Sequence, residues 1–181
     1  MTTEETIKNI KKELRANMNG IASQYMRENG LAYHINFGIE LPRLRYIASE
    51  FEPSHEVAQQ LWHENVRESK ILATMLMPID RFYPEVADIW VSQVGNTEIA
   101  QMAVMNLFSR LPYAPTKAFE WIARDDELTQ LCGYLIIARL LRDGAEFNER
   151  TTAELKDQML AVAPDAPLAL RKAIMAINLN F

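Results

Sequence analysis

Apolar residues recur along this chain at the spacing of α-helices. Ile7, Ile10 and Leu14 lie three or four positions apart, with lysines on the opposite face, which is the pattern of a helix with one buried side. Thr2, with Glu5 three residues later, predicts a capping box at the start of that helix. No stretch alternates apolar and polar residues between turn signals as a half-buried strand does. The pattern therefore predicts an all-helical chain.

Prolines and capping residues divide the rest of the chain into short helices. Pro42 lies where a proline is tolerated in a first turn, Ser54 can cap a helix that ends near Trp62, and Pro78 ends the next helix. We expect Asn96 or Thr97 to cap another. Including that one, the pattern predicts further helices over residues 21–28, 66–77, 84–90, 97–108, 116–124, 126–142, 149–162 and 167–177.

Three tryptophans mark a repeat. Trp62, Trp90 and Trp121 each close a short amphipathic helix, and they are spaced by 28 and 31 residues. Each is followed by a polar linker and a second helix that carries small residues, namely Ala73, Ala100 and the pair Cys132-Gly133. Such helix pairs bury both faces only by stacking on one another. The repeat therefore predicts one domain over residues 1–181, an α-α superhelix of the HEAT-like or ARM type. A helical bundle with evenly spaced tryptophans is the alternative.

The composition is that of an ordinary globular protein. Of 181 residues, 49% are apolar and 24% are charged, which is typical of one soluble domain. Cys132 is the only cysteine, and the lack of an internal disulfide favours a reducing, cytoplasmic location. The longest apolar run, residues 131–138, is far shorter than the roughly 20 residues of a membrane-spanning helix. The N-terminus carries Glu4 and Glu5 and no apolar h-region, so we expect no secretory signal.

Other chemistry has little support. His34, His55 and His63 lie far apart and lack the spacing of metal ligands. The sequence contains no glycine-rich phosphate loop and no serine-hydrolase motif. We therefore expect no metal and no cofactor.

Several short motifs are similar to a known family. They are Tyr25-Met26, then Phe37-Gly38-Ile39, then Pro42 with Arg45 three residues on, then Leu61-Trp62, and Glu68 with Ala73 five residues on. Together they resemble the AlkD-like DNA alkylation repair family, over about residues 5–143. The resemblance implies a HEAT-like solenoid whose concave face grips duplex DNA. It also implies release of N-alkylated bases, by an aromatic residue one helical turn before an aspartate and an arginine on the next inner helix.

This chain departs from the family at those reactive positions. Thr97 stands in place of the aromatic residue, Gln101 in place of the aspartate and Gln130 in place of the arginine. A neutral glutamine cannot offset the positive charge that develops on the sugar as the base leaves. We take Thr97, Gln101, Gln130 and Tyr134 as candidates for the concave site. The chain also ends at Phe181, short of the usual family member, so we expect a divergent, shortened relative without standard glycosylase chemistry.

Two alternatives stay open. A register shift of one turn would make Glu98 the fallback catalytic residue of an active glycosylase with a rearranged site. A protein-interaction scaffold with no DNA role is favoured by the net charge of -5, from 19 basic and 24 acidic side chains spread evenly along the chain. We expect the partner to be double-stranded DNA or a protein, and no membrane. The candidates for contact with nucleic acid are Arg43, Arg45, Arg67, Lys70, Arg171 and Lys172, with scattered solubilising charge as the other interpretation.

Overall fold

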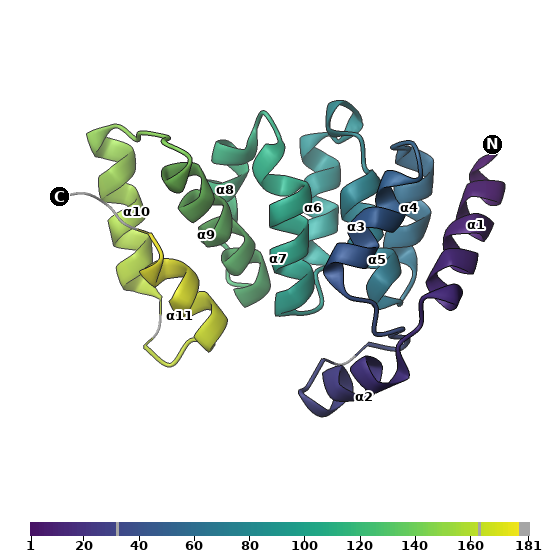
Figure 1. Ribbon diagram of the computed structural model, residues 1–181. Helices are drawn as coiled ribbons and strands as arrows, with labels where there is room; N and C mark the ends of the chain where they lie inside the picture. The colour runs from purple at the N-terminus through teal and green to yellow at the C-terminus, as the bar shows by residue number, and fades with distance from the viewer. Residues whose placement is uncertain (32, 163, 178–181) are drawn as a thin grey trace. The chain divides into compact units, whose positions relative to one another are not determined.

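The chain folds into short helices that pair with their neighbours (Figure 1). The computed structural model describes residues 1–31, 33–162 and 164–177, so Phe181 lies outside the described residues. Within these ranges the only β-type pairing is one isolated parallel bridge between Ile35 and Val66, and the all-helical prediction is confirmed. The chain divides into two compact units, Met1–Phe82 and Tyr83–Phe181. One domain over residues 1–181 therefore stays a prediction.

The first unit is built around α5. Its helices are α1 (Thr3–Ala16), α2 (Gly20–Glu28), α3 (Leu41–Ser49), α4 (His55–His63), α5 (Arg67–Leu76) and the 3₁₀ helix η1 (Ile79–Arg81). α5 packs along α4 and against α3, and α1 contacts α4. The predicted capping box is present, since Thr2 Oγ1 accepts a hydrogen bond from the Glu5 N–H at 3.2 Å and Glu5 Oε2 accepts one from the Thr2 N–H at 2.8 Å.

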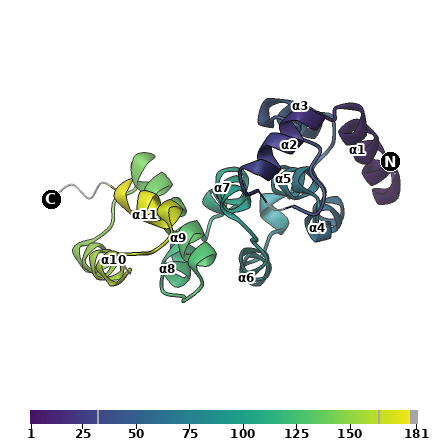
Figure 2. The ribbon, with the colours of Figure 1, turned by 90° about the horizontal axis from the view of Figure 1, so that it is seen from below.

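The second unit is built around α9. Its helices are α6 (Pro84–Ser92), α7 (Thr97–Asn106), η2 (Phe108–Arg110), α8 (Ala114–Ile122), α9 (Glu127–Arg142), α10 (Glu149–Ala161) and α11 (Leu168–Met175). α9 packs along α8 and also contacts α7 and α11. Figure 2 shows α9 beside α8 and α11. α9 is thus in contact with its neighbours on several sides.

The tryptophan repeat corresponds to structural units. Trp62, Trp90 and Trp121 lie near the ends of α4, α6 and α8, and each is at most 1% exposed. The small residues predicted on the following helices, Ala73, Ala100 and Cys132, are 0% exposed. Burial, with a smaller effect of the Asp126 charge, raises the pKa of the Cys132 thiol to about 12, so this cysteine is a core residue, as its sequence context predicts.

Gly133 explains why α8 and α9 can approach closely. A Cβ added there would lie 2.7 Å from Ile122 Cγ2 and 2.8 Å from the Ala118 carbonyl oxygen. These distances are shorter than real Cβ contacts, so the absence of a side chain at this position lets the two helices pack.

The predicted helix over residues 97–108 needs a correction. Asn96 caps α7, with its Oδ1 accepting a hydrogen bond from the Ile99 N–H at 2.9 Å, but α7 ends at Asn106. Leu107 leaves the helical region at φ −133° and ψ −66°, and η2 follows. α8 then begins at Ala114, earlier than predicted, because Pro115 falls in its first turn, where the missing N–H costs nothing. No described helix is long and apolar enough to cross a membrane.

Candidate functional site

A groove runs over the surface of α9 between α7 and α11. It consists of two hollows with volumes of about 320 Å³ and 480 Å³, which share Gln101, Leu135 and Ala176 in their linings. In Figure 1, α9 lies between α7 and α11 within this unit. We call it the α9 groove, and it is lined by Gln101, Val104, Met105, Leu131, Leu135, Ala138, Arg139, Arg142, Leu168, Ala169, Lys172, Ala173 and Ala176.

The charged lining of the α9 groove is entirely basic. Arg139, Arg142 and Lys172 line it, and none of the described residues that line it is acidic. Arg142 Nε lies 3.4 Å from Asp143 Oδ1, in a pair whose side chains are both more than half exposed, so solvent screens that interaction. The groove therefore carries local positive charge on a chain with a net charge of -5, and such a surface attracts anions.

Thr97, Gln101 and Gln130 stand at the positions where the family resemblance implies reactive residues. Of these three, only Gln101 lines this groove. It is exposed on α7, one turn after Thr97. Thr97 and Glu98 are half-buried at the start of α7, and neither lines either hollow. At the position where the family resemblance implies a carboxylate, the groove therefore presents a neutral amide.

Gln130 and Tyr134, the two concave-site candidates on α9, do not line the α9 groove. Gln130 Nε2 donates a hydrogen bond to the Arg124 carbonyl oxygen at 2.6 Å and thereby ties α9 to the connection from α8. Tyr134 is 0% exposed, and burial raises its pKa to about 12. Its hydroxyl has no hydrogen-bond partner among the described residues. Of the four concave-site candidates, only Gln101 lines the α9 groove.

Two of the predicted DNA-contacting cations are engaged inside the first unit. Arg67 is 4% exposed, and its Nη1 donates to the Ile39 carbonyl oxygen at 2.8 Å and to Glu68 Oε1 at 2.9 Å. Lys70 Nζ donates to the Trp62 carbonyl oxygen at 2.7 Å and lies 4.7 Å from the centroid of the Trp62 ring. Burial lowers the pKa of Lys70. Both side chains thus bind backbone oxygens of their own unit, and their contact with nucleic acid stays a prediction.

The other four predicted cations are exposed. Arg43 Nε donates to Asn17 Oδ1 at 2.7 Å, and its guanidinium lies 4.7 Å from the centroid of the Tyr46 ring. Arg171 Nε donates to the Ala166 carbonyl oxygen at 2.9 Å. Arg45 is exposed on α3. Lys172 alone among the six lines the α9 groove.

Sequence reasoning missed Arg139 and Arg142. Both lie on the last turns of α9, and the spacing of Arg139 from Leu135 and of Arg142 from Ala138 is four residues. Residues four apart share a helix face. The spacing from Leu135 and Ala138 therefore indicates that both arginines lie on the same face of the predicted 126–142 helix as these apolar residues.

No group of three or more His, Cys, Asp or Glu side chains that could hold a metal ion occurs in the described part of the chain. The side chains that line the α9 groove are neutral, apolar or basic.

Comparison with known proteins gives two matches. The sequence model of the DNA alkylation repair enzyme family matches residues 10–176. A search of curated proteins finds no match. A solved structure, described as a new family of proteins related to the HEAT-like repeat DNA glycosylases with affinity for branched DNA structures, is similar at a TM-score of 0.82. The likeness covers 94% of this chain and 73% of that chain, at 19% identity, and it confirms the predicted HEAT-like fold.

Proposed function

Because the chain belongs to the DNA alkylation repair enzyme family, we propose that it binds DNA through the α9 groove without the family's usual glycosylase chemistry. The observation that carries this proposal is the lining of the groove. Gln101 is exposed in a groove whose charged side chains, Arg139, Arg142 and Lys172, are all basic.

The basic lining supports DNA binding on electrostatic grounds. Phosphate contacts by lysine and arginine release counterions from DNA, and this term dominates non-specific affinity. Arg139 and Lys172 have no ion-pair partner among the residues that the structure describes, so their charges are available to phosphates. Three cations can give modest affinity that falls steeply as salt rises.

Gln101 supports the absence of standard chemistry. A departing alkylated base leaves a cationic sugar, which a carboxylate stabilises and an amide does not. Glu98 is the nearest carboxylate on α7, but it does not line either hollow. An active glycosylase that uses Glu98 would need this side chain to reach into the groove.

The related structure suggests which DNA is bound. That protein's family has affinity for branched DNA structures. We propose the same class of ligand for this chain, with branched DNA bound more tightly than a linear duplex of the same length. The cytoplasmic location predicted from the sequence stays part of this proposal.

Two assays test the proposal. In a band-shift series at low salt, the full chain is expected to retard a branched junction more strongly than a linear duplex. With methylated DNA as substrate, it is expected to release no 3- or 7-methylpurine. Failure to shift either DNA at the lowest salt contradicts DNA binding, and release of methylpurine that is lost in Glu98→Gln establishes the glycosylase alternative.

One observation favours a protein partner as a second candidate. α2 exposes Ile21 and Tyr25, which are 86% and 67% exposed and lie one turn apart on the same face. An exposed apolar helix face is typical of interaction surfaces. A partner recovered with the wild-type chain after nuclease treatment, and lost with an Ile21→Ser and Tyr25→Ser double variant, supports this role. Recovery by both chains contradicts it.

A further inference from the structure

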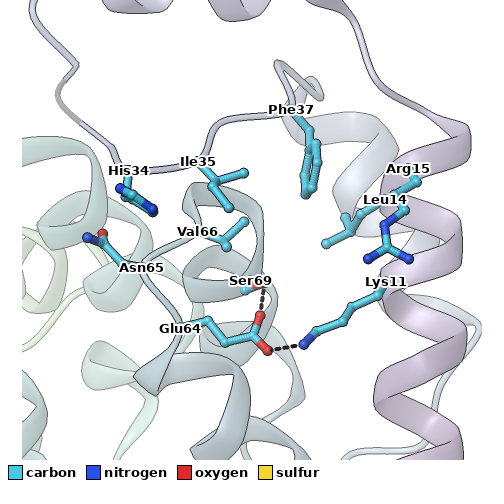
Figure 3. Close-up of a pocket in the computed structure, with 10 residues that line it drawn as sticks. All are labelled: Lys11, Leu14, Arg15, His34, Ile35, Phe37, Glu64, Asn65, Val66 and Ser69. Carbon is cyan, nitrogen blue, oxygen red and sulfur yellow. Dashed lines mark hydrogen bonds and ion pairs between the residues drawn. The ribbon is translucent and has the colours of Figure 1, made fainter.

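A separate cavity lies within the first unit, between α1, the segment over residues 34–37 and the start of α5 (Figure 3). Its volume of about 350 Å³ lies at the small end of the range for ligand pockets, roughly 300–1,000 Å³. We call it the α1 pocket, and it is lined by Lys11, Leu14, Arg15, His34, Ile35, Phe37, Glu64, Asn65, Val66 and Ser69. Nothing in the proposed function uses it.

The walls of the α1 pocket are apolar and include an aromatic ring. Phe37 points into the cavity from the connecting segment, and Leu14 faces it from α1 (Figure 3). Ile35 and Val66 close the side nearest α5. Such walls bind a flat or apolar body of limited size.

The rim of the α1 pocket carries an excess of positive charge. Lys11 Nζ lies 2.6 Å from Glu64 Oε1, and Glu64 Oε2 accepts a hydrogen bond from Ser69 Oγ at 2.7 Å. These contacts neutralise the Lys11 charge and close one end of the cavity. Arg15 lies one turn after Lys11 on α1, and its guanidinium has no partner among the described residues. Arg15 therefore offers this rim a positive charge that an anionic group could bind.

Two further polar side chains complete the rim. His34 and Asn65 are exposed there, and Figure 3 shows them side by side at the end opposite α1. An imidazole and a carboxamide can each both donate and accept hydrogen bonds. Across the pocket, the anionic group of a ligand would thus lie near α1 and a hydrogen-bonding edge near His34 and Asn65.

We propose that the α1 pocket binds a single unstacked nucleotide, with the base against Phe37 and the phosphate on Arg15. This assignment rests on the proposed DNA-binding function. A base has a π-face for an aromatic ring, an edge that donates and accepts hydrogen bonds, and an attached phosphate. All three features match groups on this pocket. A peptide C-terminus with an apolar side chain shares the anionic and apolar parts but has no flat face with a polar edge.

The test is an NMR titration of the full chain with deoxyadenosine monophosphate (dAMP). dAMP is expected to shift the resonances of His34, Phe37 and Ile35, and adenosine, which lacks the phosphate, to bind about tenfold more weakly. Arg15→Gln is expected to reduce dAMP affinity to that of adenosine. Lys12→Gln is the matched control, because Lys12 lies on the same helix but does not line the α1 pocket, and it should bind dAMP as the wild type does.

Three results overturn the assignment. They are no shift at millimolar dAMP, equal affinity for dAMP and adenosine, and tighter binding of N-acetyl-leucine than of dAMP at the same residues, the last of which would identify a peptide terminus as the ligand. The outcome is independent of the α9 groove, because Lys172→Gln and Arg139→Gln should leave dAMP binding unchanged. Loss of duplex binding in those variants with dAMP binding intact separates the two proposals.

Discussion

Arg67 Nη1 lies 2.9 Å from Glu68 Oε1, and the two side chains are 5% and 0% exposed. The Glu68 carboxylate also accepts hydrogen bonds from the N–H groups of Phe37 and Ile39, at 3.0 Å and 3.2 Å. Arg67 donates to the Ile39 carbonyl oxygen. The pair therefore fixes the turn around Gly38 against the start of α5. Glu68, which belongs to the motifs that resemble the DNA alkylation repair family, thus holds the backbone of Phe37 and Ile39 in place.

Glu68→Gln is expected to destabilise the fold strongly. The substitution removes the negative charge beside the buried Arg67 guanidinium, and removing one partner of a buried pair typically lowers the free energy of unfolding by about 3–5 kcal/mol. Urea denaturation followed by circular dichroism measures the change. Glu40→Gln is the control, since Glu40 is exposed and makes no side-chain cap bond at α3. Equal stability of the two variants contradicts the role given to the pair.

Gly133→Ala is expected to lower the free energy of unfolding by about 1–3 kcal/mol, the usual cost of overpacking a core. The new Cβ would meet backbone at Ala118, and backbone cannot move aside as a flexible side chain can. At Gly95, an added Cβ meets nothing within 4 Å, so Gly95→Ala should change stability by less than about 0.5 kcal/mol. Thermal melts of both variants decide the comparison, and a Gly133→Ala chain as stable as wild type contradicts the close packing of α8 and α9.

Asp88 links α6 to α8 in the second unit. Its Oδ1 accepts a hydrogen bond from Trp121 Nε1 and its Oδ2 one from Lys117 Nζ, both at 2.8 Å. Burial alone would raise the pKa of Asp88, but these hydrogen bonds and the charges of Lys117 and Arg124 outweigh it and lower the pKa. Because the folded pKa lies below the unfolded value of about 3.9, this contribution is present above about pH 4 and is lost as the pH falls through the folded pKa.

Asp88→Asn is therefore expected to be less stable than wild type at pH 7 and to lose less stability on acidification. Urea denaturation at a series of pH values from neutral to strongly acidic measures this difference. Asp125→Asn, at an exposed position before α9, should follow the wild-type profile. Parallel profiles for wild type and Asp88→Asn would contradict the stated role of the carboxylate.

The sequence predicts the architecture better than the site. The spacing of apolar residues and the three tryptophans identify the helix pairs, because a helix with one buried face has apolar residues at regular intervals in its sequence. No such pattern in the sequence shows what a lysine or arginine side chain binds. Arginine and lysine are usually exposed, and only the fold shows that Arg67 and Lys70 bind carbonyl oxygens. Arg139 and Lys172 belong to one groove only because α9 and α11 pack together, and their separation in sequence gives no sign of this.

The salt dependence of DNA affinity shows whether the α9 groove binds phosphates. Affinity for a branched junction is measured at several salt concentrations for wild type, an Arg139→Gln and Lys172→Gln double variant, and the control Arg150→Gln, which is exposed on α10 and does not line the groove. Each lost phosphate contact should reduce the slope of log affinity against log salt by about 0.9. We expect a reduction near twice that value in the double variant and none in the control. Equal slopes for all three chains, or no binding at the lowest salt, would mean that the α9 groove does not bind phosphates.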